Sequence, residues 1–267
     1  MIKLPKIEDP RGNLSFIEAG PRGVCPFEIQ QVEWRYDVPS GTSFKSRVRK
    51  GAEEMYVAMS GSFDIVASSD PLRFTLNRSD RAIVAGAGDE VVIDNFSTNS
   101  VLLKLSSETD EDIIAGEELV EDPATSHRDS DIEDVRMVDL WRVQIQKSSY
   151  TAIYNDCLAI PFKVRRAFYL YDVPADAERG GHSHYMAQEL IVALTGSFDV
   201  VLDDGKHAPR RYSLNRPYRG LYIPAGMWRT LDNFSGGAVC LVLTSERYSE
   251  ADYVREYDEF KRLTANA

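Results

Sequence analysis

Short apolar runs rich in valine, isoleucine, tyrosine and phenylalanine follow one another along the chain, separated by glycine, proline and aspartate pairs. Runs of this length and composition are typical of β-strands, and the breaks between them contain the residues that tight turns require. One such break, Asp204-Gly205, is a characteristic hairpin pair. The pattern predicts an all-β protein built as a sandwich or a barrel.

Internal repetition decides the predicted architecture. Motifs of the first half recur at an offset of 135 residues and, after a three-residue difference in one loop, at an offset of 138. The repeat predicts two similar barrels in tandem. The motifs Pro26-Phe27, Tyr36-Asp37-Val38-Pro39, Gly61-Ser62-Phe63-Asp64, Leu76-Asn77-Arg78 and Asp94-Asn95-Phe96-Ser97 return as Pro161-Phe162, Tyr171-Asp172-Val173-Pro174, Gly196-Ser197-Phe198-Asp199, Leu214-Asn215-Arg216 and Asp232-Asn233-Phe234-Ser235.

Each barrel is predicted to end in a helix, over residues 107–120 and 245–262. Serine and acidic residues open both segments, and apolar residues recur in them at helical spacing. The stretch between the two repeats is acidic and lacks apolar periodicity, which is typical of a solvated linker. The predicted organisation is an N-terminal barrel at 1–120, an acidic linker at 121–135 and a C-terminal barrel at 136–267.

Composition narrows the class of protein. With 267 residues, 43% of them apolar, the chain can bury one large core or two ordinary ones. No apolar run approaches the roughly 18 residues of a membrane helix, and the N-terminus lacks the apolar core of a signal peptide. Cys25, Cys157 and Cys240 are widely spaced in apolar surroundings, as expected of buried, reduced thiols. We expect a soluble, cytoplasmic protein without a membrane partner.

The net charge of −11 argues against nucleic acid as a partner. The position of the charged residues along the chain matters more than the net charge. Residues 108–134 contain twelve acidic residues and one arginine, so this segment accounts for the whole net charge. The remainder of the chain is neutral, and an anionic small molecule remains compatible with it.

Two of the four histidines, His182 and His184, stand two residues apart in the second repeat. On a strand, both imidazoles would face the same side of the sheet. Glu189 and Gly196 follow at the spacing of the first cupin motif. This similarity implies two tandem cupin (jelly-roll) barrels, each followed by a short C-terminal helix.

The first repeat lacks these imidazoles. Arg47 and Arg49 occupy the equivalent positions, whereas Glu54 corresponds to Glu189. Arginine stays protonated and cannot serve as a general base or an ordinary metal ligand. We therefore place the active site in the second barrel.

The second cupin motif is incomplete in a way that bears on metal binding. Gly220, Pro224, Gly226 and Asn233 are present, but Arg229 occupies the position of the histidine. The full set of three histidines and one glutamate is thus absent. His182, His184 and Glu189 leave a two-histidine, one-carboxylate metal site as an alternative.

The second repeat resembles the cupin-fold dTDP-4-keto-6-deoxyglucose 3,4-ketoisomerases, the WxcM-like sugar ketoisomerases. The first repeat carries the N-terminal signature of this family as Asp9-Pro10-Arg11-Gly12-Asn13-Leu14-Ser15-Phe16-Ile17-Glu18. Members are usually homodimers that exchange N-terminal strands, and they generally hold histidine where this chain has Arg229. The motifs in the second repeat are Tyr169-Leu170-Tyr171-Asp172-Val173-Pro174, Arg179-Gly180-Gly181-His182-Ser183-His184, Leu214-Asn215-Arg216-Pro217, Gly220-Leu221-Tyr222-Ile223-Pro224 and Glu250-Ala251-Asp252-Tyr253.

The resemblance implies that a dTDP-linked 4-keto-6-deoxy sugar is isomerised through an enediolate, without a cofactor or metal. Such a reaction needs a general base near neutral pKa, which histidine provides. We expect His184 to be the base and His182 to orient it or to shuttle the second proton. Arg179, Tyr171 and Arg229 are candidate donors to the enediolate oxygen.

Substrate binding is assigned to further residues of the second repeat. Arginines suit a diphosphate because of their fork geometry, and aromatic rings suit a nucleotide base. Purely structural roles are also open for three of these residues. Tyr171 and Trp228 can serve the packing of the barrel, and Arg216 belongs to a turn that both repeats retain. The candidates are Arg179, Arg216 and Arg219 for the diphosphate, Tyr169, Tyr222 and Trp228 for the base, and Glu189 and Arg229 in the pocket.

Two other functions stay open at this point. One is a metal-dependent cupin enzyme that uses His182, His184 and Glu189, and the other is a non-catalytic double cupin that binds a sugar nucleotide. The fusion itself makes a prediction: a monomer that acts as a pseudo-dimer, or a homodimer of such chains. Residues 11–18 should then pack beside the second barrel, and each chain should bind one nucleotide sugar.

Overall fold

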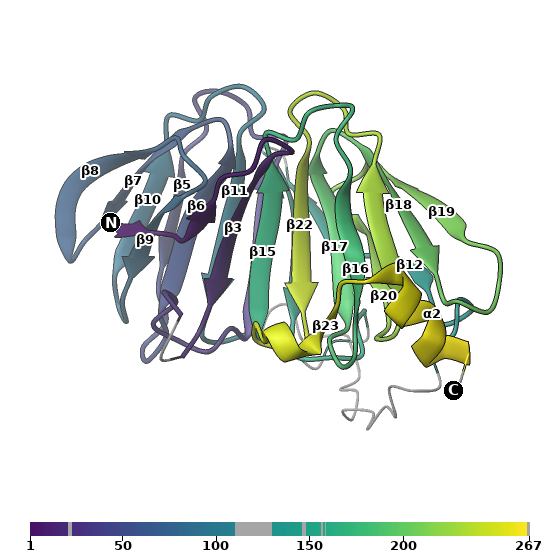
Figure 1. The fold of residues 1–267 in the computed structure, drawn as a ribbon. Coiled ribbons are helices and arrows are strands. Elements are labelled where there is room, and N and C mark those ends of the chain that lie inside the picture. The colour runs from purple at the N-terminus through teal and green to yellow at the C-terminus, as the bar shows by residue number, and fades with distance from the viewer. Residues whose placement is uncertain (21–22, 110–129, 146–147, 156, 158, 266–267) are drawn as a thin grey trace.

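The computed structural model describes residues 1–20, 23–109, 130–145, 148–155, 157 and 159–265. These residues form antiparallel β-sheets, with one α-helix near the C-terminus (Figure 1). The predicted all-β class is confirmed. Within the described ranges, none of the helical segments has the length and apolar character needed to cross a membrane.

The first barrel consists of a seven-stranded and a four-stranded sheet. In spatial order, the larger sheet contains β1 (Ile2–Lys3), β9 (Arg81–Ala85), β6 (Glu54–Ser60), β11 (Val101–Ser106), β4 (Gln31–Tyr36), β14 (Ser148–Tyr154) and β13 (Arg142–Ile145). The smaller sheet contains β5 (Phe44–Arg47), β10 (Glu90–Asp94), β7 (Phe63–Ala67) and β8 (Asp70–Leu76).

The second barrel repeats this arrangement with a seven-stranded and a five-stranded sheet. The larger sheet contains β12 (Arg136–Asp139), β20 (Arg219–Ile223), β17 (Glu189–Thr195), β22 (Val239–Thr244), β15 (Arg166–Tyr171), β3 (Asn13–Glu18) and β2 (Lys6–Ile7). The smaller sheet contains β19 (Arg210–Leu214), β18 (Phe198–Asp203), β21 (Trp228–Asp232), β16 (Arg179–His184) and β23 (Tyr253–Val254).

The two barrels exchange strands. β3, from the N-terminal repeat, pairs with β15 of the second barrel, with Phe16 opposite Phe168. Conversely, β14 from the C-terminal repeat pairs with β4 of the first barrel, with Ala152 opposite Glu33. Figure 1 shows the purple β3 beside the teal β15. The hypothesis that the 11–18 segment packs beside the second barrel is confirmed for the strand it contains, and β14 is the reciprocal element that the sequence did not reveal.

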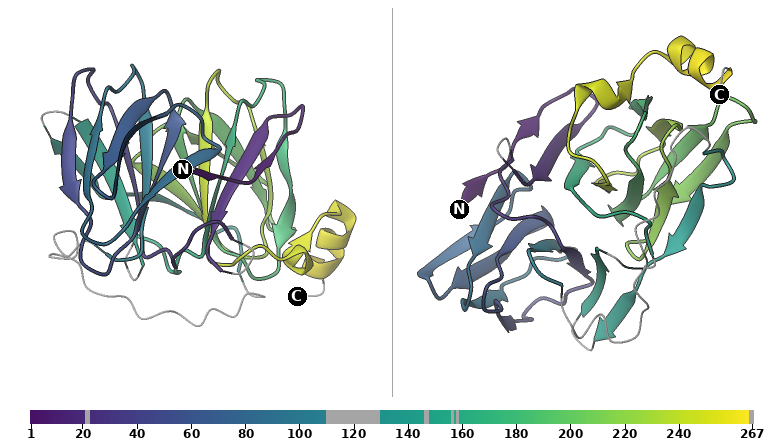
Figure 2. Two further views of the ribbon diagram at one scale, coloured as in Figure 1. Left: turned by 90° about the vertical axis from the view of Figure 1, so that its left-hand side faces the viewer. Right: turned by 90° about the horizontal axis from the view of Figure 1, so that it is seen from below.

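A shared apolar core joins the two larger sheets, and the barrels lie side by side (Figure 2). Two related hydrogen bonds cross this interface: the Trp34 indole N–H donates to the Pro217 carbonyl at 2.6 Å, and the Tyr169 hydroxyl donates to the Ser79 carbonyl. The sequence boundaries 1–120 and 136–267 therefore describe the repeat, whereas the hydrogen-bonded barrels each borrow a strand from the other repeat.

The predicted C-terminal helix is wrong over its first half. Residues 250–252 form a single 3₁₀ turn, Tyr253–Val254 pair with β16 as β23, and the helix α2 spans Tyr257–Ala265. The serine and acidic residues before α2 are typical of a helix start. The segment forms a strand instead, because β23 pairs with β16 at the edge of the barrel. The other predicted helix, at 107–120, lies almost entirely outside the described residues.

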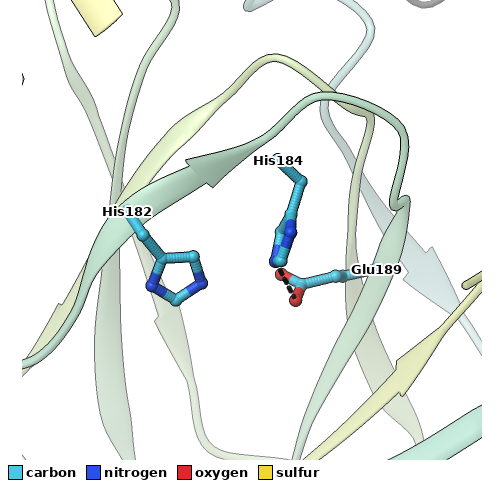
Figure 3. A group of neighbouring side chains, drawn as sticks. All are labelled: His182, His184 and Glu189. Carbon is cyan, nitrogen blue, oxygen red and sulfur yellow. Dashed lines mark ion pairs between the residues drawn. The ribbon is translucent and has the colours of Figure 1, made fainter. Parts of the chain in front are cut away.

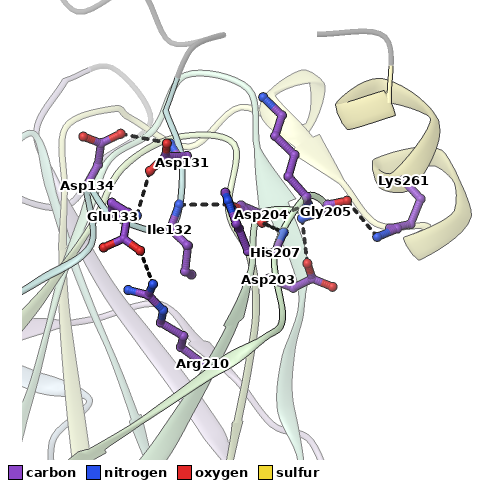
Figure 4. A network of polar contacts seen from close by, with 11 residues as sticks. Asp131, Ile132, Glu133, Asp134, Asp203, Asp204, Gly205, His207, Arg210 and Lys261 are labelled. Atoms are coloured by element: carbon purple, nitrogen blue, oxygen red, sulfur yellow. Dashed lines mark hydrogen bonds and ion pairs between the residues drawn. The ribbon is translucent and has the colours of Figure 1, made fainter.

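The end of the acidic linker is anchored rather than solvated (Figure 4). Ile132 is fully buried, and its N–H donates to the Asp204 carboxylate at 3.0 Å. The same carboxylate contacts Nδ1 of His207 at 2.7 Å, and Glu133 pairs with Arg210. These contacts correct the prediction for the last residues of the 121–135 segment, of which 121–129 lie outside the described residues. The three cysteines are free and buried, as predicted.

Candidate active site

The second barrel contains a cavity of about 540 Å³ between its two sheets. One wall is formed by alternate residues of β3 and β15, among them Phe16 and Phe168, and the opposite wall by β16 and β21. Because β3 comes from the N-terminal repeat, this cavity is completed by strand exchange. The segment that follows β22 contributes Tyr248, Tyr253 and Arg255 to the same cavity.

A cluster of charged and titratable groups lies beside the cavity, and Figure 3 shows three of its members, His182, His184 and Glu189. Nε2 of His184 lies 3.4 Å from Oε1 of Glu189, and Nε of Arg229 lies 3.1 Å from Oε2 of the same carboxylate. The Glu189 side chain is 1% exposed and that of Arg229 2%. His182 lines the cavity, with its ring centroid 5.0 Å from that of His184.

His184 is held between two carboxylates. Its Nδ1 lies 3.0 Å from the Asp252 carboxylate, which also accepts the N–H groups of Met186 at 2.7 Å and Ala187 at 3.2 Å. With Nδ1 directed at Asp252, Nε2 is the nitrogen that faces Glu189. This geometry is that of a histidine oriented by an acidic partner, as in the base of a catalytic triad.

Electrostatics set the protonation of the groups around His184. Burial and the neighbouring Arg229 lower the pKa of His182 to about 3, so this imidazole is neutral at pH 7. Burial tends to raise the pKa of Glu189, but Arg229 and His184 outweigh it and keep that pKa below its usual value. The pKa of Asp252 is likewise lowered, against burial, by His184 and the two backbone N–H groups. The site thus combines a neutral histidine with two ionised carboxylates.

The alternative metal site does not fit this arrangement well. One ligand atom from each of His182, His184 and Glu189 lies within 4.8 Å of the others. However, the guanidinium of Arg229 neutralises Glu189 from within ion-pair distance. A divalent cation bound by the same carboxylate would lie beside this buried positive charge, with strong repulsion at low local dielectric. We therefore derive no step through a metal.

Four of the predicted site residues, Arg179, Glu189, Arg229 and His182, line the cavity, whereas His184 is not among its lining residues. Tyr169 and Tyr171 do not line the cavity either, which corrects the assignment of Tyr169 to the nucleotide base and of Tyr171 to the enediolate oxygen. They share the face of β15 that packs into the core between the barrels, where the Tyr171 hydroxyl lies 3.1 Å from Ser15 Oγ. Side chains alternate along a strand, so Phe168 and Leu170, on either side of Tyr169, face the cavity instead.

The remaining predicted substrate contacts also lie elsewhere. Tyr222 packs in the inter-barrel core and donates to Oε1 of Gln188 at 2.6 Å. Trp228 packs against Tyr257 and Phe260 of α2. Neither aromatic ring lines the cavity, because each faces away from it on its strand. Arg219 pairs with Asp139 at 3.0 Å, and Arg216 donates to the Asn215 carbonyl in an exposed turn, consistent with its structural reading.

Several cavity residues were missed by the sequence prediction. Arg166 lies under the rings of Phe16, Phe168 and Tyr248, with its guanidinium carbon 4.8–5.6 Å from their centroids. Arg11 also lines the cavity. The Arg11–Glu18 signature and the Glu250–Tyr253 motif could have identified Arg11 and Tyr253, but they were recognised without roles for their individual residues, and Arg166 lies outside both.

The first barrel has an ion-pair network at the corresponding place. Lys104 Nζ lies 3.1 Å from Glu33 and 3.8 Å from Glu54, and Arg35 lies 3.1 Å from Glu33. At the offsets of the repeat, Glu33, Arg35 and Lys104 correspond to apolar residues of the second barrel, Phe168, Leu170 and Val242. Charged side chains thus occupy positions that line the cavity in the second barrel.

Comparison with known proteins supports the assignment to one family. The family model described as "FdtA: WxcM-like, C-terminal" matches residues 1–114 and 133–265. A TDP-4-oxo-6-deoxy-α-D-glucose-3,4-oxoisomerase from Aneurinibacillus thermoaerophilus is 39% identical over 106 residues, 40% of this chain and 76% of the relative.

Solved structures include similar proteins of about half the length. A 3,4-ketoisomerase from Helicobacter canadensis is 38% identical, covering 49% of this chain and 98% of its own, with a TM-score of 0.48. The sugar 3,4-ketoisomerase QdtA from Thermoanaerobacterium thermosaccharolyticum, in complex with TDP, is 32% identical, covering 51% and 98%, with a TM-score of 0.49. Because the family model matches both repeats, the chain belongs to the FdtA family of WxcM-like, C-terminal proteins.

Proposed function

We propose that this protein is a nucleoside-diphosphate-sugar 3,4-ketoisomerase, which moves the carbonyl of a dTDP-4-keto-6-deoxyhexose from C4 to C3. The observation that carries the proposal is the His182, His184, Glu189 and Arg229 cluster beside a cavity large enough for a sugar nucleotide. Membership of a family with relatives named as 3,4-oxoisomerases gives the cluster its substrate class.

In the proposed mechanism, Nε2 of His184 removes the proton from C3. The electron pair enters the C3–C4 bond, and negative charge develops on the oxygen at C4. The hydroxyl proton moves from the C3 oxygen to the C4 oxygen, and a proton returned to C4 completes the product. Glu189 and Asp252 stabilise the imidazolium that forms on His184, because both carboxylates contact its ring.

Arg229 is the proposed donor to the enediolate oxygen. In the described part of the chain, its guanidinium nitrogens are buried without a hydrogen-bond partner, although Nε lies close to Glu189. Buried N–H groups of this kind gain a partner when an oxyanion forms beside them, which stabilises the transition state more than the substrate. His182, neutral and at the cavity wall, is proposed to relay the proton of the His184 imidazolium to C4, taking up a proton on one ring nitrogen as the other releases one, so that both rings end neutral.

The proposed nucleotide contacts lie away from this cluster, along β3 and its neighbours. Arg179 lines the cavity and donates to the Gly12 carbonyl at 2.9 Å, which places it beside the N-terminal signature. Together with Arg11 and Arg166 it offers a diphosphate several guanidinium forks. Phe16 and Phe168 offer apolar surface for the nucleoside.

The proposal is tested by incubating the protein with dTDP-4-keto-6-deoxyglucose in D₂O and recording the NMR spectrum of the sugar. We expect a 3-keto product and deuterium at the reacting carbons. Tight binding of the nucleotide sugar without exchange would favour the non-catalytic binder. Activity lost on chelation and restored by a divalent metal would favour the metal-dependent cupin.

We predict one nucleotide site per chain. The first barrel has charged side chains where the second has cavity-lining apolar ones, and only the second has the two histidines. Calorimetric titration with dTDP should therefore give a stoichiometry of one. Two equivalent sites per chain would contradict the prediction, as would a fragment of residues 136–267 that folds and turns over at the full-length rate without β3.

We predict that Arg47→Ala and Arg49→Ala change the isomerisation rate by less than about tenfold. Arg47 is an exposed side chain that pairs with Glu90 at 2.6 Å, and Arg49 donates to the Thr109 carbonyl. Neither lines the cavity. Steady-state kinetics of the two variants check this, and a large loss of activity in a folded variant would mean that the barrels have been assigned the wrong way round.

A further inference from the structure

Asp252 is the acidic partner of His184, although 68 residues separate them in the sequence. We propose that Asp252 is a positioning residue: it holds the proton of His184 on Nδ1 and thereby leaves the lone pair on Nε2, the nitrogen directed at Glu189. The proposal rests on the proposed function for its catalytic consequence. Its structural content, the tautomer of one imidazole, is independent of that function.

The carboxylate of Asp252 is fixed by donors on both oxygens. Oδ1 accepts the Met186 N–H at 2.7 Å, whereas Oδ2 faces His184 Nδ1 at 3.0 Å and the Ala187 N–H at 3.2 Å. The backbone carbonyl of Asp252 accepts the Tyr185 N–H at 2.9 Å. Asp252 therefore holds the turn after β16 together with the imidazole at the end of that strand. Rotation of the carboxylate would break contacts with backbone donors as well as with the ring.

The elements around Asp252 keep this contact in place. Directly after it, β23 pairs with β16, with Tyr253 opposite His184 and Val254 opposite Ser183. The helix α2 then packs on the second barrel through Phe260, which is 2% exposed. Strand pairing on one side and helix packing on the other fix the chain that carries Asp252. The C-terminal segment that contains Asp252, β23 and α2 is thus part of the candidate site.

A second acidic residue in the same segment provides a matched control. Glu250 lies two residues before Asp252, but its side chain is 62% exposed and pairs with Arg255 at 2.7 Å. Its removal changes the charge of the segment by the same amount without touching the histidine. Glu250→Gln and Asp252→Asn therefore differ in the contact to His184 and in burial.

Asp252→Asn should reverse the tautomer. The Met186 N–H, whose contact at 2.7 Å is shorter than that of the Ala187 N–H at 3.2 Å, keeps the amide oxygen of the asparagine at the Oδ1 position. The NH₂ group then faces His184, and the Ala187 contact is lost. That NH₂ group donates to Nδ1, so the imidazole proton moves to Nε2 and the lone pair on the nitrogen directed at Glu189 is lost. We expect kcat to fall about tenfold to a hundredfold, with KM changed less than threefold. Glu250→Gln should keep kcat within a factor of two and affect KM alone, because its partners Tyr248 and Arg255 line the cavity.

Nitrogen-15 NMR of the histidine rings identifies the tautomer of His184 directly and does not depend on catalytic activity. We expect the Nδ1–H tautomer for His184 in the unaltered protein and the Nε2–H tautomer in Asp252→Asn. In the His184→Asn background, Asp252→Asn should cause no further loss of kcat, because it acts through the histidine. An unchanged tautomer, or losses that multiply in the double variant, would overturn the proposal. Absence of turnover in the unaltered protein would instead overturn the proposed function and leave the NMR result to decide the role of Asp252.

Discussion

Replacing His184 by asparagine is expected to lower the turnover of a dTDP-4-keto-6-deoxyhexose at least a hundredfold while leaving the fold intact. The substitution removes the base but keeps a similar volume and a hydrogen-bonding group next to Asp252. General-base catalysis contributes roughly a hundredfold to ten-thousandfold, so the loss should lie in that range. Steady-state kinetics and the circular dichroism spectrum of the variant give the two measurements.

His182→Asn is the natural comparison, and we expect it to lose less activity. His182 is the histidine that lines the cavity, and its neutral imidazole suits a shuttle for the second proton. His184 is 4% exposed but is the one oriented by a carboxylate. A His184→Asn variant that retains most of the activity, or a His182→Asn variant that loses more, would transfer the role of base to His182.

Replacing Arg229 by methionine is expected to affect stability and activity together. The substitution leaves the Glu189 carboxylate, 1% exposed, without the guanidinium that lies 3.1 Å from it. Removing one partner of a buried ion pair destabilises a protein by about 3–5 kcal/mol. Loss of the proposed oxyanion donor should also lower kcat roughly a hundredfold to a thousandfold. Urea unfolding at pH 7 and steady-state kinetics measure the two effects.

A second substitution separates the two effects of Arg229→Met. Adding Glu189→Leu removes the uncompensated charge, so the double variant should recover most of the lost stability but none of the lost activity. Arg47→Ala is the control in the first barrel, because its ion pair with Glu90 is exposed and its removal should leave stability nearly unchanged. Recovery of activity in the double variant would show that Arg229 serves only to neutralise Glu189.

The two barrels have diverged into complementary parts of one unit. The N-terminal repeat supplies β3, whose Phe16 and Leu14 line the cavity, while its own barrel contains the Lys104–Glu33 ion pair at the corresponding position. The C-terminal repeat supplies the histidines and returns β14 to the first barrel. The two barrels that exchange strands belong to one chain and differ in sequence. Because the contact between the barrels no longer joins identical partners, neither repeat has to contain a complete site.

Sequence alone was sufficient for the fold class and the duplication, and it directed the candidate site to the second barrel. Strand-forming runs are local, the repeat is visible as an offset, and the His182–His184 pair needs only the alternation of a strand to place both imidazoles on one side. The crossing of the Arg11–Glu18 signature to the other barrel also followed, because the repeat that kept this signature had lost the histidines.

The choice of face for Tyr169 and Tyr171 was decided only by tertiary structure. One face of β15 lines the cavity, and its opposite face packs against the first barrel. Apolar residues therefore occupy nearly all positions of this strand, and no alternation of apolar and polar residues identifies the face that lines the cavity. The contact between Asp252 and His184 was equally out of reach, because it depends on pairing β23 with β16 across 68 residues. Local patterns determine which segments become strands, but which side of a strand faces the substrate, and which distant carboxylate meets a histidine, depend on how the finished sheets pack against each other.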